Sequence, residues 1–476
     1  MRDQPRLPTS PAFWRSPVRG TWFTSVLGLV LLAGITVMFV TGLVSYAAYN
    51  PDLSPVNDTT PDKGILGFYL FDWPAGPSWL YRLSQGVHVT LGVTLVPVLL
   101  AKLWSVVPKL FALPPARSLA HALERVSLLL LVGGGLFEFT TGIFNIQLNY
   151  VFPGSFYPLH FYGAWVFFSA FVAHAALKAP AAVRTVRGRG RGGDGGAGDG
   201  GEGNAGEGRT DEGGEGNSGD GHAGDGRTGS AGDGRTGNAG DGRTGSAAGG
   251  VPGPASVSSD DLAAPSPHPP TVSRRGALWL VGGGSLLLFV SVVGQSLGGP
   301  FRRTALLAPH GGPDPDGGPN GFQINKTAAY AGITHADTDP DAWRLVVTGR
   351  TGTVRLGRAE LLALPLRSSS LPIACVEGWS TADQWWRGVR LSDLAALVGY
   401  DGDPPDVFVE SLQRHGAFRR AALRANQVAD PRSLLALYVN GEELSPDHGY
   451  PARVIVPAAP GVLNTKWVAR LTFGDL

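Results

Sequence analysis

Five long segments with little or no charge constrain this chain more than any other feature. Residues Thr21 to Pro51 carry no charge and are rich in Leu, Val and Gly. Such a run is long enough to cross a bilayer as a helix, which takes about 20 apolar residues. A buried helix of a soluble protein could explain one such run, but five favour a membrane protein. The other four are Leu83 to Ala101, Val126 to Tyr150 with Glu138 as its one charge, Pro158 to Leu177, and Ala277 to Gly298.

The basic residues predict how these spans are oriented. Arg15 and Arg19 precede the first span, and further lysines and arginines lie between the second and third spans and after the fourth. The segments on the other side hold far fewer, notably Lys63 and Arg82. Basic residues mark cytoplasmic loops, and the excess of Arg over Lys with abundant Gly and Ala is typical of a GC-rich bacterial genome. We therefore expect a multi-pass protein of the bacterial cytoplasmic membrane. Its N-terminus should lie inside and everything after Gly298 outside.

The segment 187–270 has almost no apolar content. An eight-residue unit, AGDGRTGS, begins at Ala223 and recurs at Ala231, with Asn in its last position, and at Ala239. Such a tract cannot bury a core, so it predicts a disordered cytoplasmic linker. An RNA-binding Arg-Gly segment is the alternative. Acidic residues alternate with the arginines, however, and the net charge of the chain is +1, so we expect no nucleic-acid partner.

Arg274 and Arg275 directly precede the fifth span, in the sequence TVSRRGALWL. Such a pair can simply set the topology of the span. It also resembles a twin-arginine export signal placed inside the chain. That pathway exports folded proteins that often already hold a cofactor, so this second interpretation predicts a cofactor in the domain after the span.

Three histidines, His88, His160 and His174, lie within the predicted spans. A histidine in hydrocarbon is costly, so each is a functional candidate, although a hydrogen-bonded packing residue is the plain alternative. His160 and His174 are separated by about 40° less than four helical turns, so they face the same way at opposite leaflets. His88 and His160 lie at similar depths from the outer side, and imidazole is an axial ligand of haem. We therefore predict one haem b between His88 and His160, and leave open a second at His174.

This arrangement resembles the four-helix cytochrome b subunits of respiratory enzymes, such as the membrane subunit of formate dehydrogenase. That family pairs a second-span His with one fourth-span His, and a first-span His with the other. The first span here has no His, and His121 could partner His174 only if the third helix begins early. The resemblance also implies electron exchange with quinone or quinol. Glu138 could orient a ligand, carry protons, or face a polar crevice near the outer boundary.

Residues from about Pro300 to Leu476 predict a globular α+β domain. Apolar residues alternate or run together as in strands, or recur with helical spacing. We expect strands at 343–349, 451–458 and 466–473, a helix at 356–364 that ends at Pro365, and a helix at 391–400 that Ser392 is placed to cap.

Cys375 lies in this domain and is the one cysteine of the 476 residues, which excludes an intrachain disulfide. A lone thiol usually acts as a small buried apolar residue. The alternatives are a nucleophile and a metal ligand, because both roles need the thiolate. Composition alone does not distinguish them.

Four stretches around this cysteine resemble, in the same order, the sulfite oxidase-type molybdopterin family. They are PIACVEGWS, WWRGVRLSDL, LLALYVNGEELSPDHGYPARVIVP and GVLNTKWV. The first is most similar to the periplasmic methionine sulfoxide reductase branch. The resemblance implies a molybdenum-molybdopterin cofactor to which Cys375 gives a thiolate, and a soft thiolate suits such a metal.

The resemblance also implies roles for further residues. Glu377 corresponds to a catalytic glutamate beside the metal, and its plain interpretation is an exposed loop carboxylate. Arg and Lys suit the phosphate of the cofactor. The positions that match pterin and phosphate contacts of the family are Asn325, Ser411, His448, Arg453, Asn464, Thr465 and Lys466.

Together these features predict a membrane oxidoreductase that reduces an S-oxide, free or in a protein, or an N-oxide outside the membrane. The electrons would come from quinol through a haem. One alternative oxidises sulfite or a related reductant and passes electrons to quinone, and another is a non-catalytic receptor that keeps the fold. The expected parts are a cytoplasmic N-terminus at 1–20, a cytochrome b-like four-helix membrane domain at 21–180, a Gly-rich linker at 181–272, a fifth transmembrane helix with the twin arginine at 273–299, and the molybdopterin domain at 300–476.

Overall fold

The structure is a computed structural model of the whole chain. It describes residues 18–53, 71–110, 118–146, 156–191, 272–308, 317–415 and 418–476. The described residues on both sides of the predicted linker belong to one compact unit, formed within 1–189 and 259–476. Most of the predicted linker, at 192–271, lies outside the described residues.

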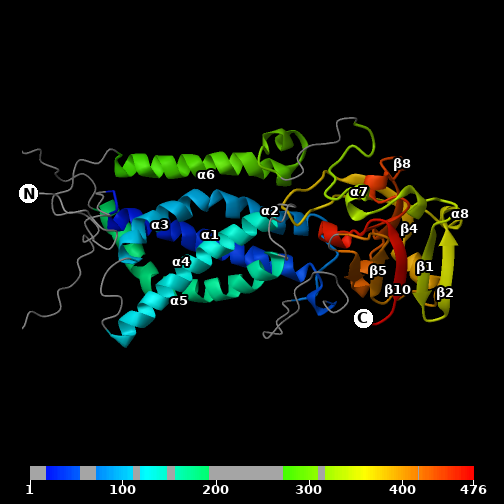
Figure 1. Cartoon of the computed structure of the whole chain (residues 1–476), viewed down its shortest axis with the longest axis horizontal. Coiled ribbons are helices and arrows are strands. Elements are labelled where there is room, and N and C mark those ends of the chain that lie inside the picture. The colour runs from blue at the N-terminus through cyan, green and yellow to red at the C-terminus, as the bar shows by residue number, and fades with distance from the viewer. Residues whose placement is uncertain are drawn as a thin grey trace, which may run out of the picture. The chain divides into compact units, whose positions relative to one another are not determined.

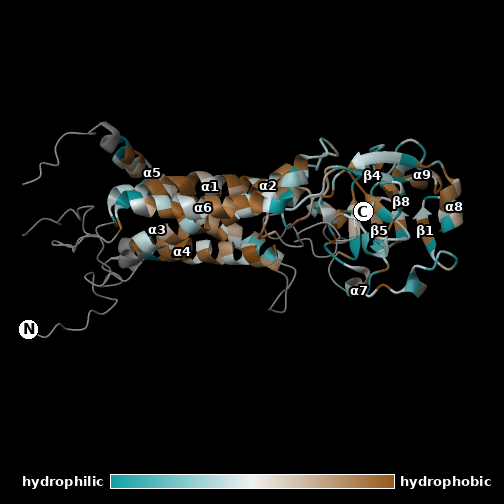
Figure 2. Ribbon diagram, turned by 90° about the horizontal axis from the view of Figure 1, so that it is seen from above, coloured by the Kyte–Doolittle hydropathy of each residue, from teal (hydrophilic) through white to brown (hydrophobic). Residues whose placement is uncertain are grey.

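The N-terminal part of this unit is helical (Figure 1). Four of its helices contain stretches long and apolar enough to cross a membrane, judged by length and composition. Figure 2 shows hydrophobic residues along most of the length of α1 and α6. The four helices are α1 (Thr21–Ala47), α4 (Leu119–Asn145), α5 (Phe156–Arg191) and α6 (Arg274–Leu297).

The second predicted span is not one straight helix. It is divided at Leu95 into α2 (Leu80–Thr94) and α3 (Val96–Leu110), which meet at a bend of 42°. Pro97 lacks the backbone N–H that would bond to the preceding turn, which explains why the helix breaks here. Counting the bent pair as one span gives up to five spans among the described residues.

Two helices also begin or end elsewhere than the sequence predicts. α4 begins at Leu119 and therefore includes His121. α5 continues to Arg191, past the predicted span end at Leu177 and into the segment expected to be linker, with Pro180 inside the helix.

Buried apolar side chains hold these helices together. α1 packs against α2 and α3, and both of these pack against α6. α4 and α5 add phenylalanines to the same core. The buried residues are Phe23, Leu27, Leu31, Ile35, Leu95, Val98, Leu99, Phe139, Phe167 and Phe171.

Arg274 and Arg275 are the first two residues of α6. Ser273 caps this helix, because its side chain accepts a hydrogen bond from Gly276 N at 3.0 Å. The pair therefore stands at the start of an apolar helix, which fits a topology signal and an export signal equally well.

The C-terminal part contains two five-stranded sheets (Figure 1). The first has the order β2-β1-β10-β5-β6, in which β1 and β10 are parallel and the other neighbours antiparallel. The second has the order β3-β4-β7-β8, with β9 paired to β7, and is antiparallel. The strands are β1 (Arg344–Gly349), β2 (Gly352–Gly357), β3 (Arg367–Leu371), β4 (Gln384–Arg390), β5 (Val407–Ser411), β6 (Arg420–Leu423), β7 (Leu434–Val439), β8 (Glu442–Glu443), β9 (Arg453–Ile455) and β10 (Val468–Phe473).

Short helices complete this part, and the predicted α+β class is confirmed. The helix expected at 391–400 is shorter than predicted, and Arg390 rather than Ser392 occupies its N-cap without a side-chain hydrogen bond, so the predicted cap is wrong. The α-helices are α7 (Ala328–Ala331), α8 (Arg358–Ala363), α9 (Leu391–Ala396) and α10 (Ala425–Ala429), and the described 3₁₀ turns are Pro51–Leu53, Gly299–Thr304, His335–Asp337, Pro446–His448 and Gly461–Leu463.

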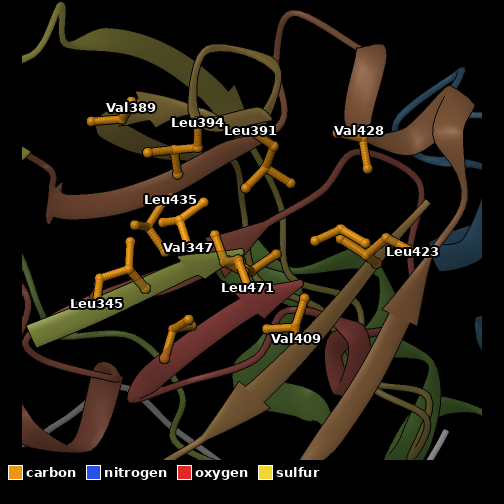
Figure 3. Packing of buried hydrophobic residues seen from close by; sticks show 14 of the residues in the cluster. Leu345, Val347, Val389, Leu391, Leu394, Val409, Leu423, Val428, Leu435 and Leu471 are labelled. Carbon is orange, nitrogen blue, oxygen red and sulfur yellow. The ribbon is translucent and has the colours of Figure 1, made fainter. Parts of the chain in front are cut away.

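The two sheets share one apolar core (Figure 3). Leu345 and Val347 are both fully buried, because alternate residues of a strand face the same side. They pack in the same cluster as Leu471 of β10, Leu435 of β7 and Leu394 of α9. This core fixes the sheets, and with them the loops at their ends that carry the candidate site.

Candidate functional site

Cys375 lies in the loop between β3 and β4, and it is 2% exposed. The loop closes tightly on itself, since Cys375 N donates to Trp379 O at 2.8 Å and Gly378 N donates to Cys375 O at 3.1 Å. Burial, and the nearby charge of Glu377, raise the pKa of the thiol well above its usual value. A bound metal would reverse this preference for the protonated thiol, because a coordinating thiol loses its proton.

Glu377 is also 2% exposed, so the alternative of an exposed loop carboxylate is wrong. Trp379 Nε1 donates a hydrogen bond to Glu377 Oε2 at 2.7 Å. Glu377 lines the same cavity as Cys375. A carboxylate fixed in this way can hold or transfer a proton beside whatever the thiolate binds.

His448, Arg453 and Lys466 form a group of basic side chains, of which the first two are buried and Lys466 is half-buried. Burial lowers the pKa of Arg453 to about 9, and burial with the charges of Arg453 and Lys466 lowers the pKa of His448 to about 2. Burial also holds the pKa of Lys466 well below its usual value. Lys466 Nζ donates to the carbonyl oxygens of Lys326 and Asp447, at 2.7 and 2.8 Å. Because Arg453 and Lys466 each carry a positive charge that burial disfavours, a bound anion such as a phosphate would stabilise both.

Five buried polar atoms of this region have no hydrogen-bond partner among the described residues. A buried polar atom left unpaired costs about 1–3 kcal/mol, so several at one place indicate a polar ligand. A pterin with a phosphate would supply both acceptors and donors, and the residues present therefore fit the predicted cofactor. The unpaired atoms are both ring nitrogens of His448, Nε of Arg453, Nδ2 of Asn464 and Oγ1 of Thr465.

One cavity of about 510 Å³ contains most of the predicted site residues. Ser411 is not among the described residues that line it, and its hydroxyl donates to Lys466 O at 2.7 Å, so it supports the lysine backbone. His448 and Arg453 are buried and are also not among the described residues that line it. The predicted residues on the wall are His88, His160, Asn325, Cys375, Glu377, Asn464, Thr465 and Lys466.

His88 of α2 and His160 of α5 face each other in this cavity, with ring centroids 6.1 Å apart and ring planes at 83°. An imidazole–metal bond is about 2 Å long, so one metal atom fits between the rings. His88 Nδ1 donates to Met38 O at 2.9 Å, and His160 Nδ1 lies 3.1 Å from Glu138 Oε2. Such contacts orient a metal-binding imidazole and leave Nε2 for the metal.

A Thr-Gly pair stands beside each of the two rings, and sequence reasoning missed both pairs. The hydroxyl lies 3.3 Å from Nδ1 of His88 in one case and 3.1 Å from Nδ1 of His160 in the other. A Cβ on either glycine would lie 3.2 Å from the ring Cε1, so glycine leaves room for the ring. The repeated dipeptide could have revealed this. The pairs are Thr41–Gly42 in α1 and Thr141–Gly142 in α4.

His174 lies further along α5 and is not among the described residues that line the cavity. α4 begins early enough to include His121, but the His121 side chain lies outside what the structure describes. A second haem at His174 therefore stays a prediction.

A family model described as Oxidoreductase molybdopterin binding domain matches residues 331–475. The uncharacterized oxidoreductase YuiH of Bacillus subtilis (strain 168) is 31% identical over 136 residues, which cover 28% of this chain and 67% of that protein. This chain belongs to the molybdopterin-binding oxidoreductases. It is an oxidoreductase, and the predicted resemblance of its C-terminal domain to the sulfite oxidase type is confirmed.

Sulfite oxidases and a sulfane dehydrogenase also match part of this chain. The mitochondrial sulfite oxidases of Rattus norvegicus and Homo sapiens are 30% identical over 160 residues, covering 28% of this chain and 29% of theirs. The sulfane dehydrogenase SoxCD of Paracoccus pantotrophus is 25% identical, with a TM-score of 0.27, over 30% of this chain and 40% of that one. The chain thus spans two thirds of YuiH and less than a third of the sulfite oxidases.

Proposed function

We propose that this chain is a membrane-bound molybdenum enzyme of the methionine sulfoxide reductase branch, fused to a cytochrome b-like bundle. It reduces an S-oxide or N-oxide outside the cytoplasmic membrane. When bound, the molybdenum cofactor supplies two-electron oxygen-atom transfer and haem b supplies single electrons. The S–O or N–O bond breaks and its oxygen leaves as water. Two protons and two electrons are consumed, and the oxidation of quinol to quinone supplies both.

The observation that carries this proposal is that one cavity is lined both by Cys375 and by His88 and His160. The cysteine is the candidate molybdenum ligand, and the histidines are the candidate haem ligands. Two redox groups held on one cavity can exchange electrons without a carrier protein. This favours a membrane electron donor built into the chain.

The chain's own residues have separate tasks in this reaction. Cys375 holds the metal, and Glu377, fixed by Trp379, delivers a proton to the departing oxygen. Arg453 and Lys466 hold the cofactor phosphate, and the remaining predicted contacts hold the pterin. The loop around Cys375 is buried, so the thiolate can be approached only through the cavity that it lines.

α2 connects the two redox sites directly. Gln85 Nε2 donates to Val376 O, next to Cys375. Gln85 lies about one helical turn before His88 on the same helix. The hydrogen bond therefore supports an electron path from the haem to the molybdenum.

The apolar helices and the distribution of basic residues support a membrane location with the molybdopterin domain outside. The twin arginine at the start of α6 supports export of that domain after cofactor insertion. An export signal at this place would explain why Arg274 and Arg275 stand between a long linker and an apolar helix.

Sulfite oxidation is the second candidate, because several relatives are named sulfite oxidases. Steady-state assays on purified enzyme separate the two directions. The proposal expects quinol oxidation that depends on dimethyl sulfoxide or trimethylamine N-oxide, and none that depends on sulfite. Reduction of quinone by sulfite, with no reaction of the oxides, would establish the second candidate instead. A receptor would support neither reaction.

A further inference from the structure

The loop that carries Cys375 is covered by helices of its own chain. Four hydrogen bonds connect loop 375–380 to α2 and α6. Backbone groups of the loop take part in three of them. α2 and α6, which together form the cover, therefore lie close along the loop. The contacts are Gln85 with Val376 O, Ser296 Oγ with Gly378 O at 2.6 Å, Ser380 N with Gln295 O at 3.0 Å, and Ser380 Oγ with Ser296 O at 3.1 Å.

Gly378 shows how close the cover lies. Its φ of +88° is in the left-handed region, which glycine adopts without strain. A Cβ at this position would lie 2.7 Å from Val89 Cβ of α2. The positive φ and the short distance to Val89 both require glycine, so α2 is in direct contact with the loop.

A second set of contacts fixes the same cover. Asn50 and Trp73, on either side of the undescribed segment 54–70, are fully buried. Asn50 Nδ2 donates to Ala422 O at 3.1 Å and to Gln427 Oε1 at 2.9 Å. Trp73 Nε1 donates to Ala458 O at 2.8 Å. Buried, directional contacts of this kind define one docked arrangement.

Aromatic and apolar side chains line the cavity beside Cys375. Tyr49 and Tyr157 both line the cavity, with stacked rings 5.3 Å apart. Phe418 and Val462 line it as well. The cavity of about 510 Å³ extends from Cys375 to His88 and His160, so the proposed haem, the molybdenum and the substrate would all share it. The room left for substrate therefore suits a few heavy atoms, and not a segment of polypeptide.

We propose that the substrate is a small, largely apolar molecule with an S-oxide or N-oxide group, and that methionine sulfoxide within a folded protein is excluded. This inference rests on the proposed function. It narrows that function, because the sequence leaves free and protein-bound S-oxides equally open. The cover formed by α2 and α6 determines the specificity.

Substrates of graded size test the inference on the full-length holoenzyme, with the haem reduced and its reoxidation followed by absorbance. We expect dimethyl sulfoxide to react about 100-fold faster, at equal sulfoxide concentration, than a folded protein oxidised at its methionines. A reaction with trimethylamine N-oxide alone would also support the inference. Equal rates for the free and protein-bound S-oxides would overturn it and leave the proposed function intact. A reaction with no oxide would overturn both.

Thiol labelling tests the cover without any turnover. Because Cys375 is the one cysteine of the sequence, the full chain from cells that lack the cofactor reports on this position alone. At alkaline pH, which ionises part of the thiol despite its raised pKa, iodoacetamide should reach Cys375 through the cavity and label native protein. A maleimide carried on a long polyethylene glycol chain should label it only after denaturation. Labelling of native protein by both reagents at similar rates would show that the loop is open and would overturn the inference.

Discussion

His88 and His160 lie on different helices with ring centroids 6.1 Å apart, and each ring is held through Nδ1 by a contact from a neighbouring helix. His88 is held by α1 and His160 by α4. Rings fixed in this way present Nε2 to the space between them, so both should be needed for one haem.

His88→Ala should remove the b-type absorbance band or shift it, because an axial ligand is lost without a substitute. Molybdenum content per chain should stay unchanged. Quinol-driven turnover should disappear, while an artificial donor that reduces molybdenum directly should still support it. His174→Ala is the matched control and should keep the band assigned to His88. An unaltered spectrum in His88→Ala would show that this histidine is not a ligand.

Arg453→Ala should lower the molybdenum content of purified protein. Its guanidinium is buried at a cost, which is why burial lowers its pKa to about 9, and a cofactor phosphate would offset that cost. The haem band reports on folding of the helical part and should be unchanged. Full molybdenum content, measured by elemental mass spectrometry, would contradict the assignment of Arg453 to the cofactor.

Gln85→Leu should slow electron transfer from haem to molybdenum. The substitution keeps the approximate volume but removes the hydrogen bond to Val376 O. Stopped-flow absorbance should show slower haem reoxidation, with the haem spectrum and molybdenum content of wild type. Ser296→Ala is the matched control, since it removes a contact to Gly378 from α6, the helix without a candidate haem ligand. Equal slowing in both variants would show that Gln85 acts only through packing at the interface and not through a specific path for electrons.

Changing Arg274 and Arg275 together to Lys should keep the C-terminal domain in the cytoplasm or lead to degradation. The positive charge at the start of α6 is preserved, so a topology signal would still operate. Protease added to intact spheroplasts measures the location of the domain. Unchanged cleavage from outside would leave the pair as a topology signal only.

Much of the helical part could be predicted, because apolar runs report directly on burial in lipid or core. The break at Leu95 was not predicted, although Pro97 is visible in the sequence, since an apolar run does not show where a helix bends. The pairing of His88 with His160 could be predicted because the two residues lie at similar depths in two predicted spans. The Thr-Gly pairs gain meaning only once α1 lies beside α2, and α4 beside α5.

The candidate site could be predicted only where motifs mark it. Cys375 and the basic residues followed from the resemblance, but the burial of Glu377 depends on how the loop closes around Trp379. Contacts from Asn50 and Trp73 to the C-terminal part join residues more than 350 positions apart. No local sequence pattern encodes such pairs, so the cover that α2 and α6 form over the site could be found only from the structure.

The central claim is that molybdenum and haem exchange electrons within this one chain. The most direct measurement is the absorbance of quinol-reduced haem in purified protein, followed by rapid mixing with dimethyl sulfoxide. The wild type should lose its reduced b-type band in step with formation of dimethyl sulfide. Cys375→Ser should keep the band, because its haem is reduced normally but has no molybdenum site to oxidise it. Wild-type protein that contains molybdenum but shows no b-type band, or whose reduced band persists in the presence of every S-oxide and N-oxide, would contradict the account.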